Sequence, residues 1–239
     1  MHEGTVAMFD AKRLLDQFLG SQGTGGGPLG DIGRGLGGSL GGIGGGAVAG
    51  GLAGILLGTK QGRKLGGTAL KVGGVAVVGA LAYAAYRNWE AGRQPAAAGA
   101  APVLPPPQNT PFNPSGEAAQ QSLGRNLLRA MIAAAKADGH IDAREQAAVF
   151  ARMDQLDLDA DDKAFVMDEL RAPLDIDAVA GGARSPEEAA EIYTASLLAI
   201  DVDHAAERGY LAMLAARLKL DDALIAHLHA AVEGATVKA

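Results

Sequence analysis

Acidic side chains gather in two segments of the second half of the chain, "KADGHIDAREQ" (136–146) and "AIDVDHAAE" (199–207). Six of these acids could supply oxygen ligands to a divalent cation: Asp138, Asp142 and Glu145 in the first segment, and Asp201, Asp203 and Glu207 in the second. Calcium and magnesium prefer such hard oxygen ligands, and one site needs several of them. The sequence therefore predicts a candidate divalent-cation site, which requires the two segments to face each other.

A structural role explains the same residues. Asp142 and Glu145 have the spacing of a capping box, which begins a helix. Gly139 can end the helix before it, and Asp203 can cap the helix that follows the second segment. Both interpretations of the two segments remain open at this point.

The chain offers no other pattern typical of catalysis. It has no cysteine, which excludes disulfides, thiolate nucleophiles and cysteine-ligated metal sites. Its histidines lack the spacing of a zinc site, and its glycine-rich segment has no following strand pattern that would make it a nucleotide-binding loop. "DLDADD" (157–162) resembles the start of an EF-hand loop, but Asp162 stands where that loop requires glycine. We predict a protein that is not an enzyme and has no certain cofactor.

Composition divides the 239 residues into a basic front and an acidic back. Of the 35 glycines, 26 precede residue 90, and residues 1–116 carry a net charge of +4. Residues 117–239 carry a net charge of −10. An acidic domain is a poor partner for phosphate backbones, so we expect no nucleic-acid binding.

The front half contains two candidate membrane segments. In residues 37–58 glycine recurs at every fourth position from Gly38 to Gly58, which on a helix gives one ridge suited to close helix packing and to homo-oligomers. The second candidate, 65–86, ends in a run that is uncharged from residue 72 to residue 86. Together they predict a membrane-associated glycine zipper or helical hairpin. One span with an interfacial helix, or a flexible linker, are the alternatives.

Four regions follow from these patterns. Residues 1–34 form a short amphipathic helix and a flexible glycine-rich segment, 35–91 are membrane-associated, 92–116 are a Pro/Ala-rich linker, and 117–239 are a helical domain. The basic cluster 60–64 favours a cytoplasmic location for the back domain.

The back domain reads as an all-α bundle of about six helices. Apolar residues recur at helical spacing, and recognisable caps precede the helices. The first expected helix covers residues 117–137. Five more are expected to begin near Asp142, near Asp159, within "SPEE" (185–188), after Asp203 and near Asp221, and an additional short helix is expected after Asp175.

Four segments carry a family resemblance: "AAAKADGHIDAREQ", "PLDIDAVA", "EEAAEIYTASLLAID" and "AIDVDHAAERGYLAMLAARL". They resemble the TerB-like (tellurite-resistance) helical superfamily, and the whole layout resembles its YebE-like group of uncharacterised bacterial inner-membrane proteins. The resemblance implies an all-α bundle, the bacterial inner membrane, and the junction acids as cation ligands. It implies no reaction.

Two functional hypotheses result. The first is a membrane-tethered interaction protein of an envelope or stress response, such as a response to metal or tellurite, with an unknown protein partner. The alternative is a domain that binds or senses a divalent cation, such as calcium or magnesium, through the paired junctions.

Overall fold

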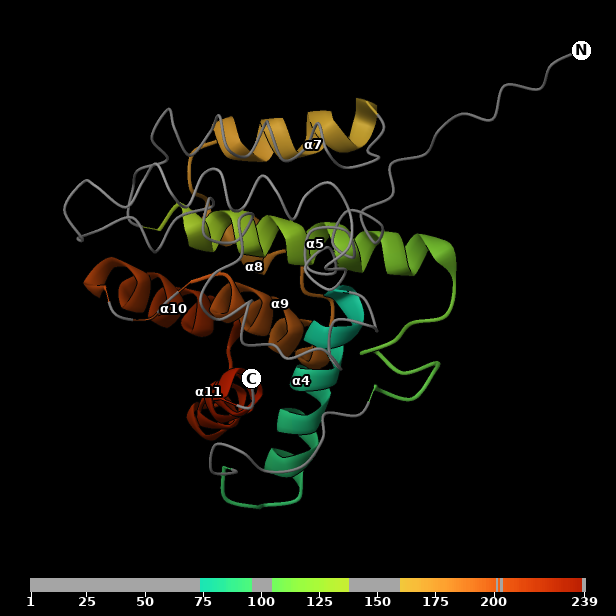
Figure 1. Ribbon diagram of the computed structural model, residues 1–239, viewed down its shortest axis with the longest axis vertical. Helices are drawn as coiled ribbons and strands as arrows, with labels where there is room; N and C mark the ends of the chain where they lie inside the picture. The colour runs from blue at the N-terminus through green and yellow to red at the C-terminus, as the bar shows by residue number, and fades with distance from the viewer. Residues whose placement is uncertain (1–73, 96–104, 138–159, 201, 203, 238–239) are drawn as a thin grey trace, which may run out of the picture.

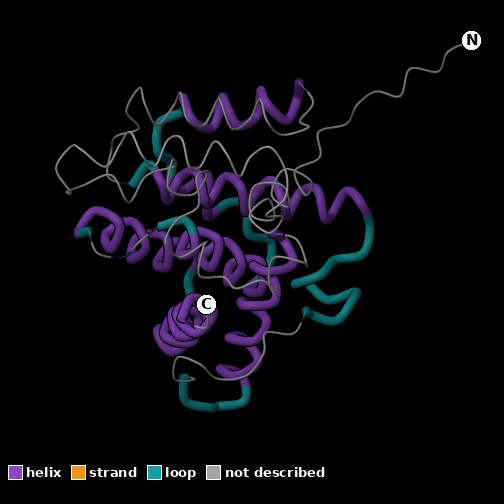
Figure 2. The backbone as a smooth tube through the Cα atoms, viewed as in Figure 1, coloured by secondary structure: helices purple, strands orange, loops and turns teal. Residues whose placement is uncertain are grey.

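The computed structural model describes residues 74–95, 105–137, 160–200, 202 and 204–237. These residues form helices and loops and contain no strand, which confirms the predicted all-α class (Figure 2). The helices are α4 (Gly74–Glu90), α5 (Glu117–Ala135), α7 (Ala160–Arg171), α8 (Ile176–Ala180), α9 (Pro186–Leu198), α10 (Ala205–Leu218) and α11 (Asp222–Val237).

Helix α9 lies at the centre of the bundle. It contacts α4, α5, α8, α10 and α11, and every residue from Ala189 to Leu198 is buried. In Figure 1, α5 and α7 lie on one side of α9, and α4 and α11 lie on the other. A helix that is buried on every face is the core of its domain, so the other elements are arranged around α9.

The start of α9 forms as the sequence predicts. The hydroxyl of Ser185 accepts a hydrogen bond from the backbone N–H of Glu188 at 3.2 Å, and Pro186 occupies the first turn. Asp175 caps α8 in the same way, because its carboxylate accepts from the N–H of Ala178 at 2.9 Å. These side chains satisfy N–H groups that have no partner inside a helix.

The start of α10 differs from the prediction by one residue. Its N-cap is His204, not Asp203, which lies outside the described residues. The carboxylate of Glu207 accepts a hydrogen bond from the backbone N–H of His204 at 3.4 Å. Because Glu207 reaches back by three positions, it sets the start of the helix at His204.

Helix α4 belongs to the bundle, in contrast to the membrane role predicted for residues 65–86. Residues 65–73 lie outside the described part, as does the first candidate span, 37–58. From Gly74 onward the chain forms α4, which packs its buried apolar side chains against α9 and α11. These side chains are Val75, Val78, Leu81, Ala82 and Ala85. The uncharged part of this helix, residues 74–86, suits a protein core as well as a bilayer, and here its apolar surface contacts protein.

None of the helices formed by the described residues combines the length and the apolar character that crossing a bilayer requires.

Two hydrogen bonds fix the end of α4 to α11. The indole N–H of Trp89 donates to the carboxylate of Asp221 at 3.1 Å, and a ring nitrogen of His227 lies 3.0 Å from the carbonyl oxygen of Arg93. Asp221 also accepts from the N–H of Ala223 at 2.8 Å and so caps the start of α11. One carboxylate therefore begins α11 and holds α4.

The described end of the predicted linker also packs on α4. Phe112 is buried, and its ring meets the rings of Tyr83 and Tyr86 edge to face, with centroids 5.5 Å apart in both pairs. The core therefore includes residues on both sides of segment 92–116.

Helix α7 attaches to α5 through charged side chains. Arg129 pairs with Glu169 at 2.7 Å and lies over the ring of Phe165. The ammonium group of Lys136 donates to the carbonyl oxygens of Glu169 and Ala172 at the end of α7. Its position suits the partial negative charge of a helix C-terminus.

If α4 is part of the core, Leu81→Ala should lower the free energy of unfolding of the full-length chain by about 2–5 kcal/mol, because the change leaves a cavity in a packed core. Denaturant unfolding followed by far-ultraviolet circular dichroism measures this loss. Glu90→Gln, at an exposed position of α4, is the control and should change the value by less than about 0.5 kcal/mol. Equal stability of both variants would contradict the packing of α4.

Candidate functional site

The structure describes one of the six predicted cation ligands. Asp138, Asp142, Glu145, Asp201 and Asp203 lie outside the described residues. Glu207 is buried at the start of α10, where it accepts the hydrogen bond from His204. Within the described ranges, no three His, Asp or Glu side chains lie close enough together to hold a metal ion. A site across the two junctions stays a prediction.

Glu191 is a buried acid in the middle of α9. Its side chain is 0% exposed, and neither carboxylate oxygen has a hydrogen-bond partner among the described residues. Burial raises the pKa of Glu191 well above its usual range, and the charges of Glu188 and Glu187 raise it further. Burial therefore favours the neutral form of this carboxyl group in the folded protein.

Gly79 of α4 lies directly against this carboxyl group. A Cβ atom at position 79 would lie 3.0 Å from Oε1 of Glu191, 2.8 Å from the carbonyl oxygen of Phe112 and 3.7 Å from Cγ of Pro106. Glycine thus permits close approach of α4, α9 and the segment 105–112. The carboxyl of Glu191 is enclosed where these three elements meet.

The other buried polar side chains of α9 have partners. The hydroxyl of Tyr193 lies 3.0 Å from a ring nitrogen of His229, and that of Ser196 lies 3.3 Å from the hydroxyl of Tyr210. The hydroxyl of Thr194 donates to the carbonyl oxygen of Ala190 at 2.7 Å. Burial raises the pKa of Tyr193 and of Tyr210 to about 12, and burial lowers the pKa of His229. These contacts join α9 to α10 and α11.

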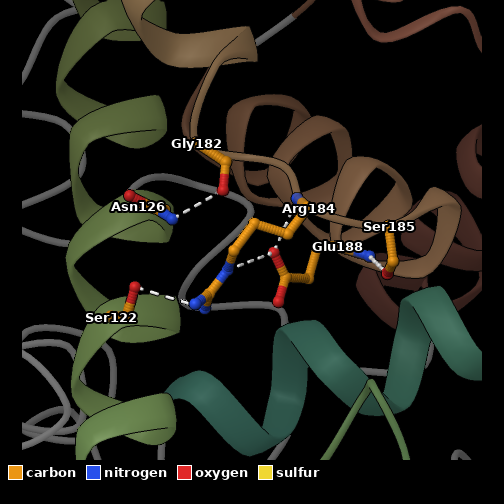
Figure 3. Close-up of polar contacts among 6 residues, drawn as sticks. All are labelled: Ser122, Asn126, Gly182, Arg184, Ser185 and Glu188. Atoms are coloured by element: carbon orange, nitrogen blue, oxygen red, sulfur yellow. Dashed lines mark hydrogen bonds and ion pairs between the residues drawn. The ribbon is translucent and has the colours of Figure 1, made fainter.

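A polar corner connects α5 to the start of α9 (Figure 3). The amide of Asn126 donates to the carbonyl oxygen of Gly182 at 2.8 Å. The backbone N–H of Arg184 donates to the carboxylate of Glu188 at 2.9 Å, and its guanidinium group lies between Glu188 and Ser122. The corner fixes the loop that leads into the central helix.

The outward face of α10 consists of small apolar residues and arginines. Tyr210, Leu211 and Leu214 point into the core, as the sequence predicts. The exposed positions are Ala205, Ala206, Arg208, Gly209, Ala212, Met213, Ala216 and Arg217. Met213 is 53% exposed, and a Cβ atom at Gly209 would meet nothing within 4 Å. Exposed helix positions normally carry polar residues, so this face is a candidate docking surface.

The buried Glu191 and the exposed apolar face of α10 were not predicted from the sequence. Glu191 is a single acid within "AAEIYTASLLAI", and its position in an otherwise apolar run was the available signal. In α10, apolar residues occupy outward as well as inward positions, so the helix lacks the expected polar face. The absence of that alternation was the signal for the docking surface.

Comparison with known proteins gives two matches. The model of a family described as "Protein of unknown function (DUF533)" matches residues 42–232. A protein of Yersinia enterocolitica described as "Uncharacterized protein in ampR 5'region" is 35% identical over 96 residues, which are 40% of this chain and 69% of that protein. No solved structure matches the chain.

The polar corner gives a testable interaction between Asn126 and Gly182. A Cβ atom at position 182 would lie 2.9 Å from the side-chain amide carbon of Asn126, so Gly182→Ala should destabilise the fold by about 1–3 kcal/mol. In an Asn126→Ala background the added methyl group has room, and the cost should fall by at least about 0.5 kcal/mol. Denaturant unfolding of the wild type, the two single variants and the double variant measures this coupling.

Gly209→Ala is the matched control, because its methyl group enters open space. It should raise the free energy of unfolding by up to about 1 kcal/mol. Additive effects of the changes at 126 and 182 would contradict the contact.

Proposed function

We propose, from the premise that this chain belongs to the family described as "Protein of unknown function (DUF533)", that it is a non-enzymatic, membrane-tethered module that docks a partner protein on α10. The single observation that carries the proposal is the exposed face of α10, with Gly209, Ala212, Met213 and Ala216 along it. Binding of a partner would remove these apolar side chains from water, which is favourable in free energy.

The sizes of the residues on this face favour a partner helix. Glycine in the interior of an exposed helix costs about 1 kcal/mol relative to alanine, and nothing around Gly209 requires it. Small residues let two helix backbones approach closely, and the flexible side chain of Met213 adapts to a partner surface. A lipid surface is favoured less, because interfacial helices insert bulky apolar side chains such as tryptophan, phenylalanine and leucine.

The charges around this face indicate which charges the partner surface should carry. Arg208 and Arg217 are exposed at the edges of the face, Lys219 follows the helix, and the exposed positions of α10 include no acid. Arg217 forms an exposed ion pair with Asp177 of α8, which offsets part of this positive charge, whereas no acid is exposed on α10 itself although residues 117–239 carry a net charge of −10. A complementary partner presents an apolar helix face flanked by aspartate or glutamate, since complementary charge steers association.

The remaining parts of the proposal rest on the sequence. The two helix junctions resemble TerB-like proteins, which supports a role in an envelope or stress response of the YebE-like kind. Residues 37–58 supply the membrane tether, and the basic cluster 60–64 after them favours a cytoplasmic bundle at the bacterial inner membrane.

Site-specific photo-crosslinking in the native cell tests the docking surface. A photo-reactive amino acid at position 213 should give a defined protein adduct, and the same residue at exposed position 164 on α7 should not. Gly209→Leu should reduce the adduct at 213 by about tenfold or more, because the larger side chain separates the two helices. Ala164→Leu is the matched control and should leave the adduct unchanged.

Protein stability separates lost docking from lost folding. Gly209→Leu enters open space and favours the helix, so the free energy of unfolding should rise by up to about 1 kcal/mol while the adduct is lost. An adduct that persists in Gly209→Leu, or one with lipid in place of protein, would refute docking of a helix on this face.

The tether is tested by extraction of membranes with alkaline carbonate. Wild-type chain should remain in the membrane pellet, and deletion of residues 37–58 should move it to the supernatant, because the deletion removes the proposed anchor. Deletion of residues 20–34, the glycine-rich segment before the proposed anchor, is the control and should leave it in the pellet. Retention of both deletion variants in the pellet would show that 37–58 is not the anchor.

A further inference from the structure

Glu191 is a buried carboxylic acid that no feature of the proposed function uses. It occupies the centre of α9, and the part of the chain that the structure describes offers no hydrogen-bond partner to either of its oxygens. A buried polar group without a partner weakens the contact that encloses it, and an ionised one weakens it far more. The position therefore makes the surrounding contact sensitive to the protonation state of one residue.

The elements around Glu191 bring no free cation toward it. On α9 itself, Glu187 and Glu188 are both acidic and oppose its ionisation. From the loop before α9, Arg184 pairs with Glu188 at 3.4 Å. Within the described ranges, no base compensates the negative charge that ionisation would create.

The basic side chains of the neighbouring helices contact groups other than Glu191. On α4, Arg87 lies over the ring of Tyr83, and Tyr86 packs against Phe112. On α5, Arg125 and Arg129 lie over Phe165. On α11, His227 and His229 contact the carbonyl oxygen of Arg93 and the hydroxyl of Tyr193, and Glu233 is acidic.

Helix α4 is the helix whose separation from α9 would open Glu191 to water. Gly79 and the segment 105–112 enclose the carboxyl group, and α4 makes its main contacts with α9 and α11. Helix α9, in contrast, is packed by five helices. Water reaches an ionised Glu191 when α4 separates, and the rest of the bundle can stay packed.

We propose that Glu191 is a proton-controlled latch: its neutral carboxyl group allows α4 to dock on α9, and its ionisation releases α4. Released α4 exposes the apolar side chains that now face the core, among them Val78 and Leu81. The inference is independent of the docking surface on α10.

The direction of the pH dependence follows from the raised pKa of Glu191 in the docked state. Below the pKa of the free carboxyl group, both the docked and the released states hold the proton, and docking is strongest. As pH rises from that value to the pKa of the docked state, separation of α4 is accompanied by loss of a proton from Glu191. The equilibrium constant for docking of α4 therefore falls by up to about tenfold per pH unit. A change driven by His229 would occur on acidification instead, because burial lowers its pKa.

Amide hydrogen exchange of the full-length chain in nonionic detergent tests the latch across a pH series. After correction for intrinsic base catalysis, residues 75–86 of α4 should lose protection as pH rises, by up to about tenfold per unit. Residues 123–134 of α5 should keep theirs over the same range. Glu191→Gln retains the shape of the side chain without its charge and should abolish the pH dependence of α4.

Two further variants keep the test decisive. Glu187→Gln, at a partly exposed position of the same helix, should retain the pH dependence, because Glu191 still titrates. Gly79→Ala places a methyl group against the carboxyl and should reduce protection of α4 at every pH. The latch is refuted if α4 of the Glu191→Gln variant loses exchange protection with rising pH as the wild type does. It is also refuted if wild-type α4 keeps its protection at every pH, or if α4 and α5 lose protection together.

Discussion

Complete burial of α9 is the constraint on which the arrangement of the other helices depends. A central helix has no solvent-facing side, so each of its faces must be covered by another element, and each buried polar side chain on it needs a partner. Helices α5, α10 and α11 meet these needs through Ser196, Tyr193 and the apolar residues between them. The remaining face, which carries Glu191, is covered by α4 and the end of the linker.

This constraint explains why residues on both sides of the linker share one core. Without α4, the face of α9 around Glu191 would be open to water, and Phe112 would lose its aromatic neighbours. The two hydrogen bonds from the end of α4 to α11 then orient the helix over this face. The apolar segment before the linker is therefore needed by the bundle that follows it.

Local signals in the sequence predicted the helices well, and tertiary placement much less. Ser185 and Pro186 act over one turn, so the start of α9 could be read from four residues. The role of α4 could not be predicted in this way, because the uncharged run 74–86 suits a bilayer and a protein core equally, and only the neighbouring elements decide between them. Burial of Glu191 likewise depends on Gly79, which is more than a hundred residues away in the sequence. The candidate cation ligands other than Glu207 lie outside the described residues.

An unpartnered acid in the core also determines where the bundle is weakest. Interfaces of α9 with α5 and α10 combine apolar packing with satisfied hydroxyl groups, including the contact between Ser196 and Tyr210. The interface with α4 also packs apolar side chains, but it encloses a carboxyl group that gains nothing from burial. Local opening follows the least stabilised contact. The contact between α4 and α9 is therefore the one that ionisation of Glu191 weakens, and the uncharged residues 74–86 allow α4 to contact another apolar surface once it has separated.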